Sequence, residues 1–366
     1  MNPPHFHTTL KAPTFAARRP GATIALAVLA ACTDSTAPPP PAGSSFAAPI
    51  AGAPMADVFY GAYIDHEPGS VVRDWACGGK SYDGHTGVDI LLRNFRVQDA
   101  GVPALAAAEG TVTRTIDGLP DRNTTWENGG GLGNYVEISH PDGLSTFYGH
   151  LRRGSIAVTR GEKVSRGAVL GLVGSSGRSN WPHLHFEVRK GGVVVEPFAG
   201  ACSPTESLWA DQLAYQDAFM VTDAGLTINP ITQGVLLERP TTVRAFPLNA
   251  AGFRFWLQVA NQRPATMRFD LHAPGGARRD SVQVQVGASF SMRYLVLDVP
   301  VSGALAEAGA WEIRTYQNGQ LIWTEPFTLL PAANAAGAAG TPSLHAKSTL
   351  AVQVLDQAPP GAVAHP

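Results

Sequence analysis

The chain has little charge and few cysteines. Only 15% of its 366 residues are charged, the formal net charge is -2, and no basic patch stands out. Because nucleic-acid binding needs clustered Lys and Arg, this composition argues against nucleic acid as a partner. No apolar run reaches the roughly 20 residues of a permanent membrane-spanning helix. The length and the 44% apolar content indicate a globular protein of about two domains.

The sequence also lacks H-E-x-x-H, the helical pattern in which two histidines bind zinc. Its histidines follow a different spacing. His183 and His185 are two residues apart, so they point to one face if they lie on a strand. His85 and Asp89 are four apart, and the glycines and β-branched residues around them favour an extended segment over a helix. We therefore expect these side chains to lie on strands of a sheet.

Four short segments resemble the motifs of the lysostaphin/LytM-type zinc metallopeptidases, which cut peptide bonds in bacterial peptidoglycan. The family pattern is H-x-x-x-D, then Y-x-H-L, then a Gly-rich turn, then P-H-L-H-F-E. The chain carries these motifs in the same order, at residues 84–89, 148–151, 174–177 and 182–187. The stretches between the motifs match as well, so the resemblance covers about residues 80–198.

The resemblance implies a role for five side chains. His85, Asp89 and His185 match the zinc ligands, and His150 and His183 match two catalytic histidines beside them. Alone, an H-x-H or an H-x-x-x-D is a weak signal. Together they supply three ligands, an open metal position and bases beside it, which is what a zinc hydrolase needs. Zn²⁺ is therefore the expected cofactor, and the resemblance does not say which histidine is the general base.

One departure from the family pattern lies just before the last motif. Asn180-Trp181 precedes Pro182, where many members carry Thr-Gly. We expect these residues to border the substrate groove, with Trp181 as a candidate lining residue. The metal motifs are untouched, so the departure bears on which peptide is preferred, and the sequence leaves the scissile bond open.

The N-terminus is typical of an export signal. Arg18-Arg19 precedes an apolar run at residues 22–31 that is too short to span a bilayer. The run ends in Leu-Ala-Ala-Cys32, which resembles a bacterial lipobox, in which the cysteine is acylated; an ordinary signal peptide cut nearby is the alternative. Thr33 stands where an aspartate would retain many lipoproteins in the inner membrane. We therefore expect a lipid anchor at Cys32 and an outer-membrane lipoprotein facing the periplasm.

The three cysteines fit this export route. If Cys32 carries lipid, Cys77 and Cys202 remain as one pair, on either side of the motif segment. An exported protein can hold such a disulfide. Zinc ligation by either of the two is the alternative, and it is disfavoured because the His/Asp set already fills three positions.

The rest of the chain divides by composition and periodicity. After residue 226, apolar residues alternate with period two, and Asn318-Gly319 is typical of a two-residue hairpin turn. We expect an all-β chain with an antiparallel β-sheet metallopeptidase domain and a smaller, immunoglobulin-like β-sandwich. The expected parts are a lipoprotein signal peptide at 1–31, a Pro/Ala-rich tether at 32–56, the zinc metallopeptidase domain at 57–202, a helical linker at 203–225, the β-sandwich at 226–331 and a disordered tail at 332–366.

These observations predict a zinc-dependent endopeptidase that hydrolyses peptide cross-links of bacterial peptidoglycan and acts as a monomer. A non-catalytic wall-binding or amidase-activating lipoprotein is the alternative, but all five site residues are present, which argues against it. A soluble protease of secreted proteins is a third possibility, and it would predict no lipobox.

Overall fold

The computed structural model describes residues 45–356 except 68, 124–129, 302–304, 306 and 333–349. The described residues belong to one compact unit. Two separate apolar cores define an N-terminal lobe (residues 45–219) and a C-terminal lobe (residues 220–356). The expected all-β class is confirmed, because the described residues form strands and only two short helices, α1 (Phe95–Ala100) and α2 (Gln233–Leu237). Within this part of the chain, no helix has both the length and the apolar character needed to cross a membrane.

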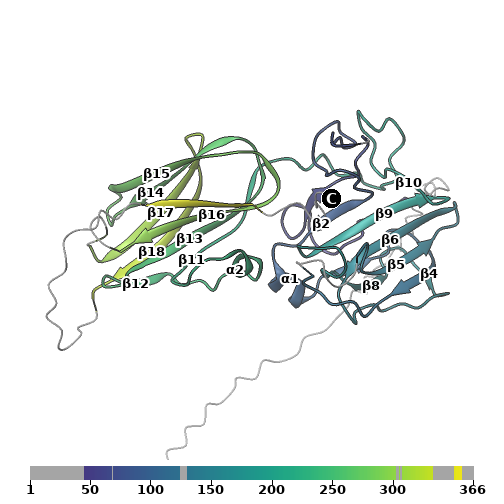
Figure 1. The fold of residues 1–366 in the computed structure, drawn as a ribbon, viewed down its shortest axis with the longest axis horizontal. Coiled ribbons are helices and arrows are strands. Elements are labelled where there is room, and N and C mark those ends of the chain that lie inside the picture. Colours follow the sequence, from purple (N-terminus) through teal and green to yellow (C-terminus); the bar gives the residue numbers. More distant parts are fainter. Residues whose placement is uncertain are drawn as a thin grey trace, which may run out of the picture. The chain divides into compact units, whose positions relative to one another are not determined.

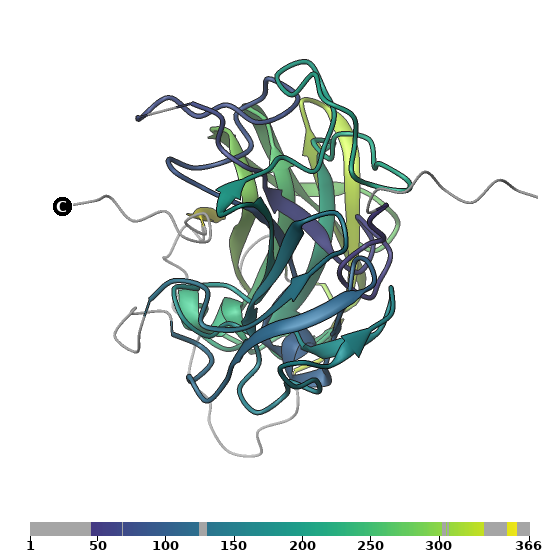
Figure 2. The ribbon, with the colours of Figure 1, turned by 90° about the vertical axis from the view of Figure 1, so that its right-hand side faces the viewer.

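The N-terminal lobe is built on one twisted antiparallel sheet in the order β1-β2-β9-β6-β5-β4-β7, with β10 paired to β9 (Figure 1 and Figure 2). Its strands are β1 (Phe59–Ala62), β2 (Val88–Leu91), β4 (Gly110–Ile116), β5 (Asn134–Ser139), β6 (Leu144–Leu151), β7 (Lys163–Val164), β9 (His183–Lys190) and β10 (Val193–Val194). A second, two-stranded sheet pairs β3 (Pro103–Leu105) with β8 (Val169–Leu172).

The central strands of this sheet are buried on both faces. On β9, Leu184 and Phe186 face the lobe's apolar core, so the histidines between them face the opposite side. The register pairs Asp89 of β2 with His185 of β9, and His185 with Gly149 of β6. Three neighbouring strands thereby bring three of the four motifs to one place on one face of the sheet.

The C-terminal lobe is a β-sandwich. Two sheets, β11-β13-β16-β19 and β12-β18-β17-β14-β15, enclose a core that includes Phe255, Phe269, Leu295 and Trp311. All neighbouring strands are antiparallel except β12 and β18. The strands are β11 (Met220–Thr227), β12 (Ala245–Pro247), β13 (Gly252–Gln262), β14 (Ala265–His272), β15 (Arg278–Val286), β16 (Ser289–Pro300), β17 (Gly309–Gln317), β18 (Gln320–Leu330) and β19 (Ala351–Asp356).

The hairpin expected at Asn318-Gly319 is confirmed. It joins β17 to β18, and both residues have positive φ angles, 48° and 86°. A two-residue hairpin turn of this kind requires positive φ at both positions, which Asn and Gly tolerate best.

The tether and the linker differ from the sequence-based boundaries. Residue 46 already belongs to the N-terminal core, because Phe46 is 1% exposed. The helix expected within 203–225 is wrong: residues 203–219 contain no helix, and β11 begins at Met220. The Phe46 amide donates a hydrogen bond to the Leu208 carbonyl oxygen, and the Ala210 amide donates one to the Phe46 carbonyl oxygen. The apolar residues of this segment therefore pack on the core from an extended chain, and tertiary contacts override the helix-compatible spacing.

The C-terminal tail also differs from expectation. Residues 351–356 form β19, which pairs antiparallel with β16 at the edge of a sheet. This pairing places Val352 and Val354 against the sandwich core, which gives the strand its apolar contacts. Residues 333–349 and 357–366 of the expected tail, and the expected signal peptide with Cys32, lie outside the described residues.

The expected disulfide between Cys77 and Cys202 is confirmed, with a sequence separation of 125 residues. Closing a loop of that length stabilises the fold by at most about 5 kcal/mol in the chain-entropy model. The loop contains every residue of the four motifs, so the bond ties together the two ends of the segment that forms the site.

Candidate metal centre

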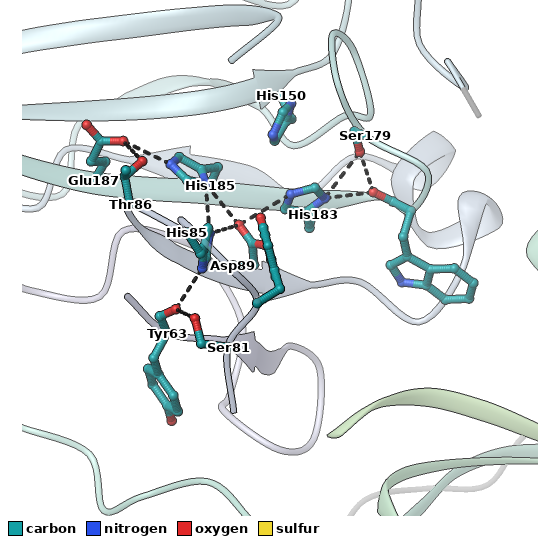
Figure 3. A network of polar contacts seen from close by, with 12 residues as sticks. Tyr63, Ser81, His85, Thr86, Asp89, His150, Ser179, His183, His185 and Glu187 are labelled. Carbon is teal, nitrogen blue, oxygen red and sulfur yellow. Dashed lines mark hydrogen bonds and ion pairs between the residues drawn. The ribbon is translucent and has the colours of Figure 1, made fainter. Parts of the chain in front are cut away.

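Three side chains converge to form a tripod on the sheet face. His85 Nε2 lies 3.2 Å from Asp89 Oδ1 and 3.3 Å from His185 Nδ1, and His185 Nδ1 lies 3.0 Å from Asp89 Oδ1 (Figure 3). All three residues are buried. Their ligand atoms all lie within 4.8 Å of one another, which is close enough for the three side chains to bind one metal ion.

The spacing of the tripod fits a tetrahedral metal ion. Ligand bonds of about 2.0–2.1 Å at tetrahedral angles place neighbouring donor atoms roughly 3.3 Å apart. The three observed distances, 3.0–3.3 Å, lie at or slightly below that value. Two imidazole nitrogens and one carboxylate oxygen leave one tetrahedral position open.

The placement of His85 refines the sequence-based expectation. Asp89 lies on β2 and His185 on β9, as expected of strand residues, but His85 precedes β2 in a turn. Its Nδ1 donates a hydrogen bond to the Tyr63 carbonyl oxygen at 2.7 Å. Because Nδ1 then carries the hydrogen, Nε2 is left as the metal-facing atom.

Asp89 is oriented by a tyrosine that no motif indicated. The Tyr82 hydroxyl donates to Asp89 Oδ2 at 3.1 Å, which leaves Oδ1 for the metal position. Burial alone would raise the pKa of Asp89. The electrostatic interactions with His85 and His183 and the contacts with His183 and His185 outweigh the effect of burial, and they hold this pKa well below its usual range. The carboxyl group is therefore an anion at neutral pH.

His185 has a carboxylate partner on its outer nitrogen. His185 Nε2 donates to Glu187 Oε2 at 3.3 Å, and Thr86 Oγ1 donates to the same oxygen at 2.6 Å. Burial opposes charge on both groups, yet the bonds from Asp89 and Glu187 raise the pKa of His185 to about 9. The pKa of Glu187 is lowered to about 2, because its bonds to His185 outweigh the effect of burial. A metal ion at Nδ1 would displace a proton from this imidazole.

His150 enters the site from the end of β6. Its ring centroid lies 4.5 Å from that of His183, and its Nδ1 donates to the Ser176 carbonyl oxygen at 2.7 Å. Nε2 is thus the free, unprotonated nitrogen. Burial lowers the pKa of His150 well below its usual value, and His183 and His185 lower it further. The ring is therefore neutral at neutral pH.

The Gly-rich turn gives His150 its backbone partner. A Cβ on Gly177 would lie 2.4 Å from the Gly133 Cα, so this close approach requires glycine. The contact holds the turn against the chain just before β5, where Ser176 can accept the hydrogen bond from His150. Sequence analysis recognised this turn as a motif but not this function.

His183 lies next to the tripod on the same strand as His185. Its Nε2 is 3.4 Å from Asp89 Oδ1, and its Nδ1 donates to the Trp181 carbonyl oxygen at 2.8 Å.

The Trp181 side chain is 2% exposed. The expectation that this indole lines an open substrate groove is therefore wrong; it is a buried side chain that packs in an apolar cluster.

A hollow of about 300 Å³ opens beside His85. Its walls include Asp65, Thr86 and a bonded pair, His66 Nε2 and Glu196 Oε2, 2.8 Å apart. The hydrogen bond to Glu196 raises the pKa of His66 above its usual value. Of the five motif residues, His85 is the one that lines this hollow.

All five motif residues meet at one place on the sheet. Five further groups support them: the side chains of Tyr82 and Glu187 and the backbone carbonyls of Tyr63, Ser176 and Trp181. The sequence signals for these supports were weak or absent. Glu187 and Ser176 lay within motifs without a role of their own, whereas Tyr82 and Tyr63 belonged to no motif. Backbone carbonyls leave no mark in a sequence, because any residue supplies one.

Comparison with known proteins agrees with this site. Residues 83–197 match the family described as Peptidase family M23. A DD-carboxypeptidase/endopeptidase, Mpg, from Neisseria meningitidis serogroup B is 37% identical over 140 residues, which cover 38% of this chain and 28% of that protein. The peptidoglycan DD-endopeptidase ShyA of Vibrio cholerae is 36% identical over 104 residues, covering 28% of this chain and 20% of that protein.

Among solved structures, the chain matches a point mutant of the catalytic domain of the prophage-encoded M23 protein EnpA from Enterococcus faecalis. The identity is 29%, the match covers 42% of this chain and 94% of that one, and the TM-score is 0.29. The chain spans under a third of the length of the two curated relatives. The resemblance seen in the sequence is confirmed by the family match for the segment that holds the tripod.

Proposed function

We propose that this protein is a zinc-dependent endopeptidase that hydrolyses peptide cross-links of bacterial peptidoglycan, a proposal supported by the match of residues 83–197 to peptidase family M23. The observation that carries the proposal is the tripod of His85, Asp89 and His185 with two further histidine rings beside it. The names of the related proteins, which are DD-endopeptidases, point to the same substrate class. In this proposal the protein works as a monomer.

Each part of the chemistry has a residue to perform it. Bound zinc would polarise the scissile carbonyl and bring the pKa of a coordinated water near neutrality. His150 Nε2 is unprotonated because Nδ1 donates to Ser176, so it can accept a proton from the attacking water. His183 Nε2 faces the same space, and in its protonated form it can stabilise the developing oxyanion or give its proton to the leaving amine.

Digestion of defined peptidoglycan tests the function. The purified, zinc-loaded chain is incubated with cross-linked peptidoglycan, and the released fragments are identified by mass spectrometry. We expect cleavage of peptide cross-links, loss of cleavage with a chelator and recovery with added zinc. Zinc-loaded protein that binds peptidoglycan without cutting it would instead favour the non-catalytic, wall-binding or amidase-activating function.

Glu187→Gln should weaken zinc binding. The substitution keeps the size of the side chain but removes the charge that His185 Nε2–H contacts. Loss of such a partner behind a metal-bound histidine usually lowers affinity by about 10–100-fold. Competition with a chelator measures the affinity, and Glu109→Gln, at an exposed position, is the control. Equal affinities of the two variants would show that Glu187 does not support the ligand.

We also propose that the protein is exported to the cell envelope and anchored by lipid at Cys32. The names of the two related proteins, both peptidoglycan or DD-type endopeptidases, support an envelope location. The sequence basis is the apolar run ending in Leu-Ala-Ala-Cys32, and Thr33 favours an outer-membrane lipoprotein facing the periplasm. A single acyl chain binds membranes only marginally, so stable anchoring requires more than one chain.

The anchor has a direct test. Wild-type protein should take up a fatty-acid probe and partition with membranes, and Cys32→Ser should do neither. An unlabelled wild-type protein would exclude the lipid anchor. The peptidase proposal would stand, because it depends on separate residues.

A further inference from the structure

The ring of His183 is held from behind by the backbone of residue 181. His183 Nδ1 lies 2.8 Å from the Trp181 carbonyl oxygen and 3.2 Å from Ser179 Oγ. The hydrogen on Nδ1 leaves the lone pair on Nε2, the nitrogen that faces the tripod. The position of the Trp181 carbonyl therefore sets both the tautomer and the orientation of this histidine.

The Trp181 side chain fixes that carbonyl from the other direction. Its Nε1 donates to the Leu92 carbonyl oxygen at 2.6 Å, and the Leu92 amide donates to the Pro182 carbonyl oxygen at 2.9 Å. The indole is 2% exposed. A buried indole carries a large apolar area and a fixed hydrogen bond, so it cannot turn without losing both.

Most of the apolar cluster around Trp181 comes from the C-terminal lobe. Its members there lie mainly on the face of the sheet β11-β13-β16-β19 that points away from the sandwich core. Gln258 of the same sheet donates to the Arg93 carbonyl oxygen at 2.9 Å, one residue beyond Leu92. The buried cluster contains Phe59, Leu91 and Trp181 of the N-terminal lobe and Leu236, Trp256, Ala260, Met292, Tyr294 and Val296 of the C-terminal lobe.

We propose that this sheet face, with Trp181 as the connecting residue, positions His183 for catalysis. The sheet face packs against the Trp181 indole, the packed indole fixes the Trp181 backbone, and the Trp181 carbonyl orients the His183 imidazole through its hydrogen bond. Trp181 is a positioning residue, because it acts through His183 and is buried away from solvent. The catalytic meaning of the inference rests on the proposed function, whereas the orientation of His183 can be tested without any activity.

Kinetics of the full chain test the coupling. Met292→Asp puts a charge into the cluster from the C-terminal lobe, where Met292 is 1% exposed. Trp181→Leu removes the indole itself. Small misplacements of a catalytic group cost up to about 10²-fold, so we expect kcat to fall by about 10–10²-fold, with KM and zinc content nearly unchanged. Trp181→Phe keeps an aromatic ring in the cluster but loses the hydrogen bond to the Leu92 carbonyl, so it should recover part of kcat. Gln283→Asp, at an exposed position on β15, should match wild type.

Nitrogen-15 NMR of the histidine side chains, on zinc-loaded protein, supplies the readout that is independent of activity. The His183 signals, assigned by their absence in His183→Ala, should shift in Met292→Asp and Trp181→Leu while those of His85 and His150 stay in place. Unchanged His183 signals and kcat in either folded variant would overturn the proposal. Loss of zinc together with a shift of all the histidine signals would also overturn it, because the sheet face would then stabilise the whole N-terminal lobe and not His183 in particular. If the wild type fails to cut peptidoglycan, the NMR shift still tests whether the sheet face positions His183. If Met292→Asp does not fold, the comparison of Trp181→Leu with Trp181→Phe provides the test.

Discussion

Asp89→Ala should abolish both metal binding and hydrolysis. Asp89 supplies the tripod's only negative charge, and its Oδ1 lies within 3.4 Å of a nitrogen on each of three histidines. Its removal takes away one ligand and leaves three buried imidazoles without the anion that compensates a bound cation. We expect zinc content to fall from about one per chain to near zero, and hydrolysis to fall by more than about 10⁴-fold, because the metal supplies both the nucleophile and the polarisation of the carbonyl.

Elemental analysis and peptidoglycan digestion measure the two effects. The double variant His85→Ala/Asp89→Ala removes two ligands and sharpens the test, and Asp99→Ala, an exposed carboxylate on α1, is the control. Full zinc occupancy in the double variant would contradict the ligand assignment. A variant with zinc lost but hydrolysis kept would contradict the metal-dependent chemistry.

His150→Ala and His183→Ala should have the opposite signature: zinc retained and turnover lost. Neither residue belongs to the tripod, yet each presents Nε2 to the space beside it. The usual contribution of a general acid or base is about 10²–10⁴-fold, and we expect losses of that size. Single-turnover rates with zinc-loaded variants measure the effect, and His272→Ala on β14 of the C-terminal lobe is the control.

The backbone of His150 calls for a second variant. Its φ is 57°, in the left-handed region that few residues other than glycine adopt easily. Asn tolerates this conformation better than Ala, so His150→Asn separates the loss of the base from added strain. Near wild-type turnover of His150→Asn or His183→Ala would exclude that residue as the base or acid.

The sequence was sufficient to predict which residues gather and on what kind of scaffold. The H-x-H spacing of His183 and His185 has a direct geometric meaning on a strand, and the structure places both on one face of β9. What holds these rings could not be predicted. Tyr82 approaches Asp89 through a turn, and the carbonyls of Tyr63, Ser176 and Trp181 bind histidines 22, 26 and 2 residues away.

The errors in the fold have one physical origin. The segment after Cys202 contains helix-compatible residues, but its backbone bonds with Phe46 from the far end of the chain. Trp181 looked like a groove residue because of its place before the last motif, and it is buried by residues more than fifty positions later, such as Trp256 and Met292. In both cases a contact remote in sequence decided the conformation, and local pattern carries no information about such contacts.

The bond between Cys77 and Cys202 closes a covalent ring around the complete site. A single backbone cut anywhere inside that ring opens it without releasing a fragment, because both pieces stay joined through the sulfur atoms. Ligands on either side of the cut, such as Asp89 and His185, would remain on one molecule and on neighbouring strands. A chain built this way can tolerate a nick in a surface loop between the two cysteines, and it becomes two separable pieces only when the bond is reduced.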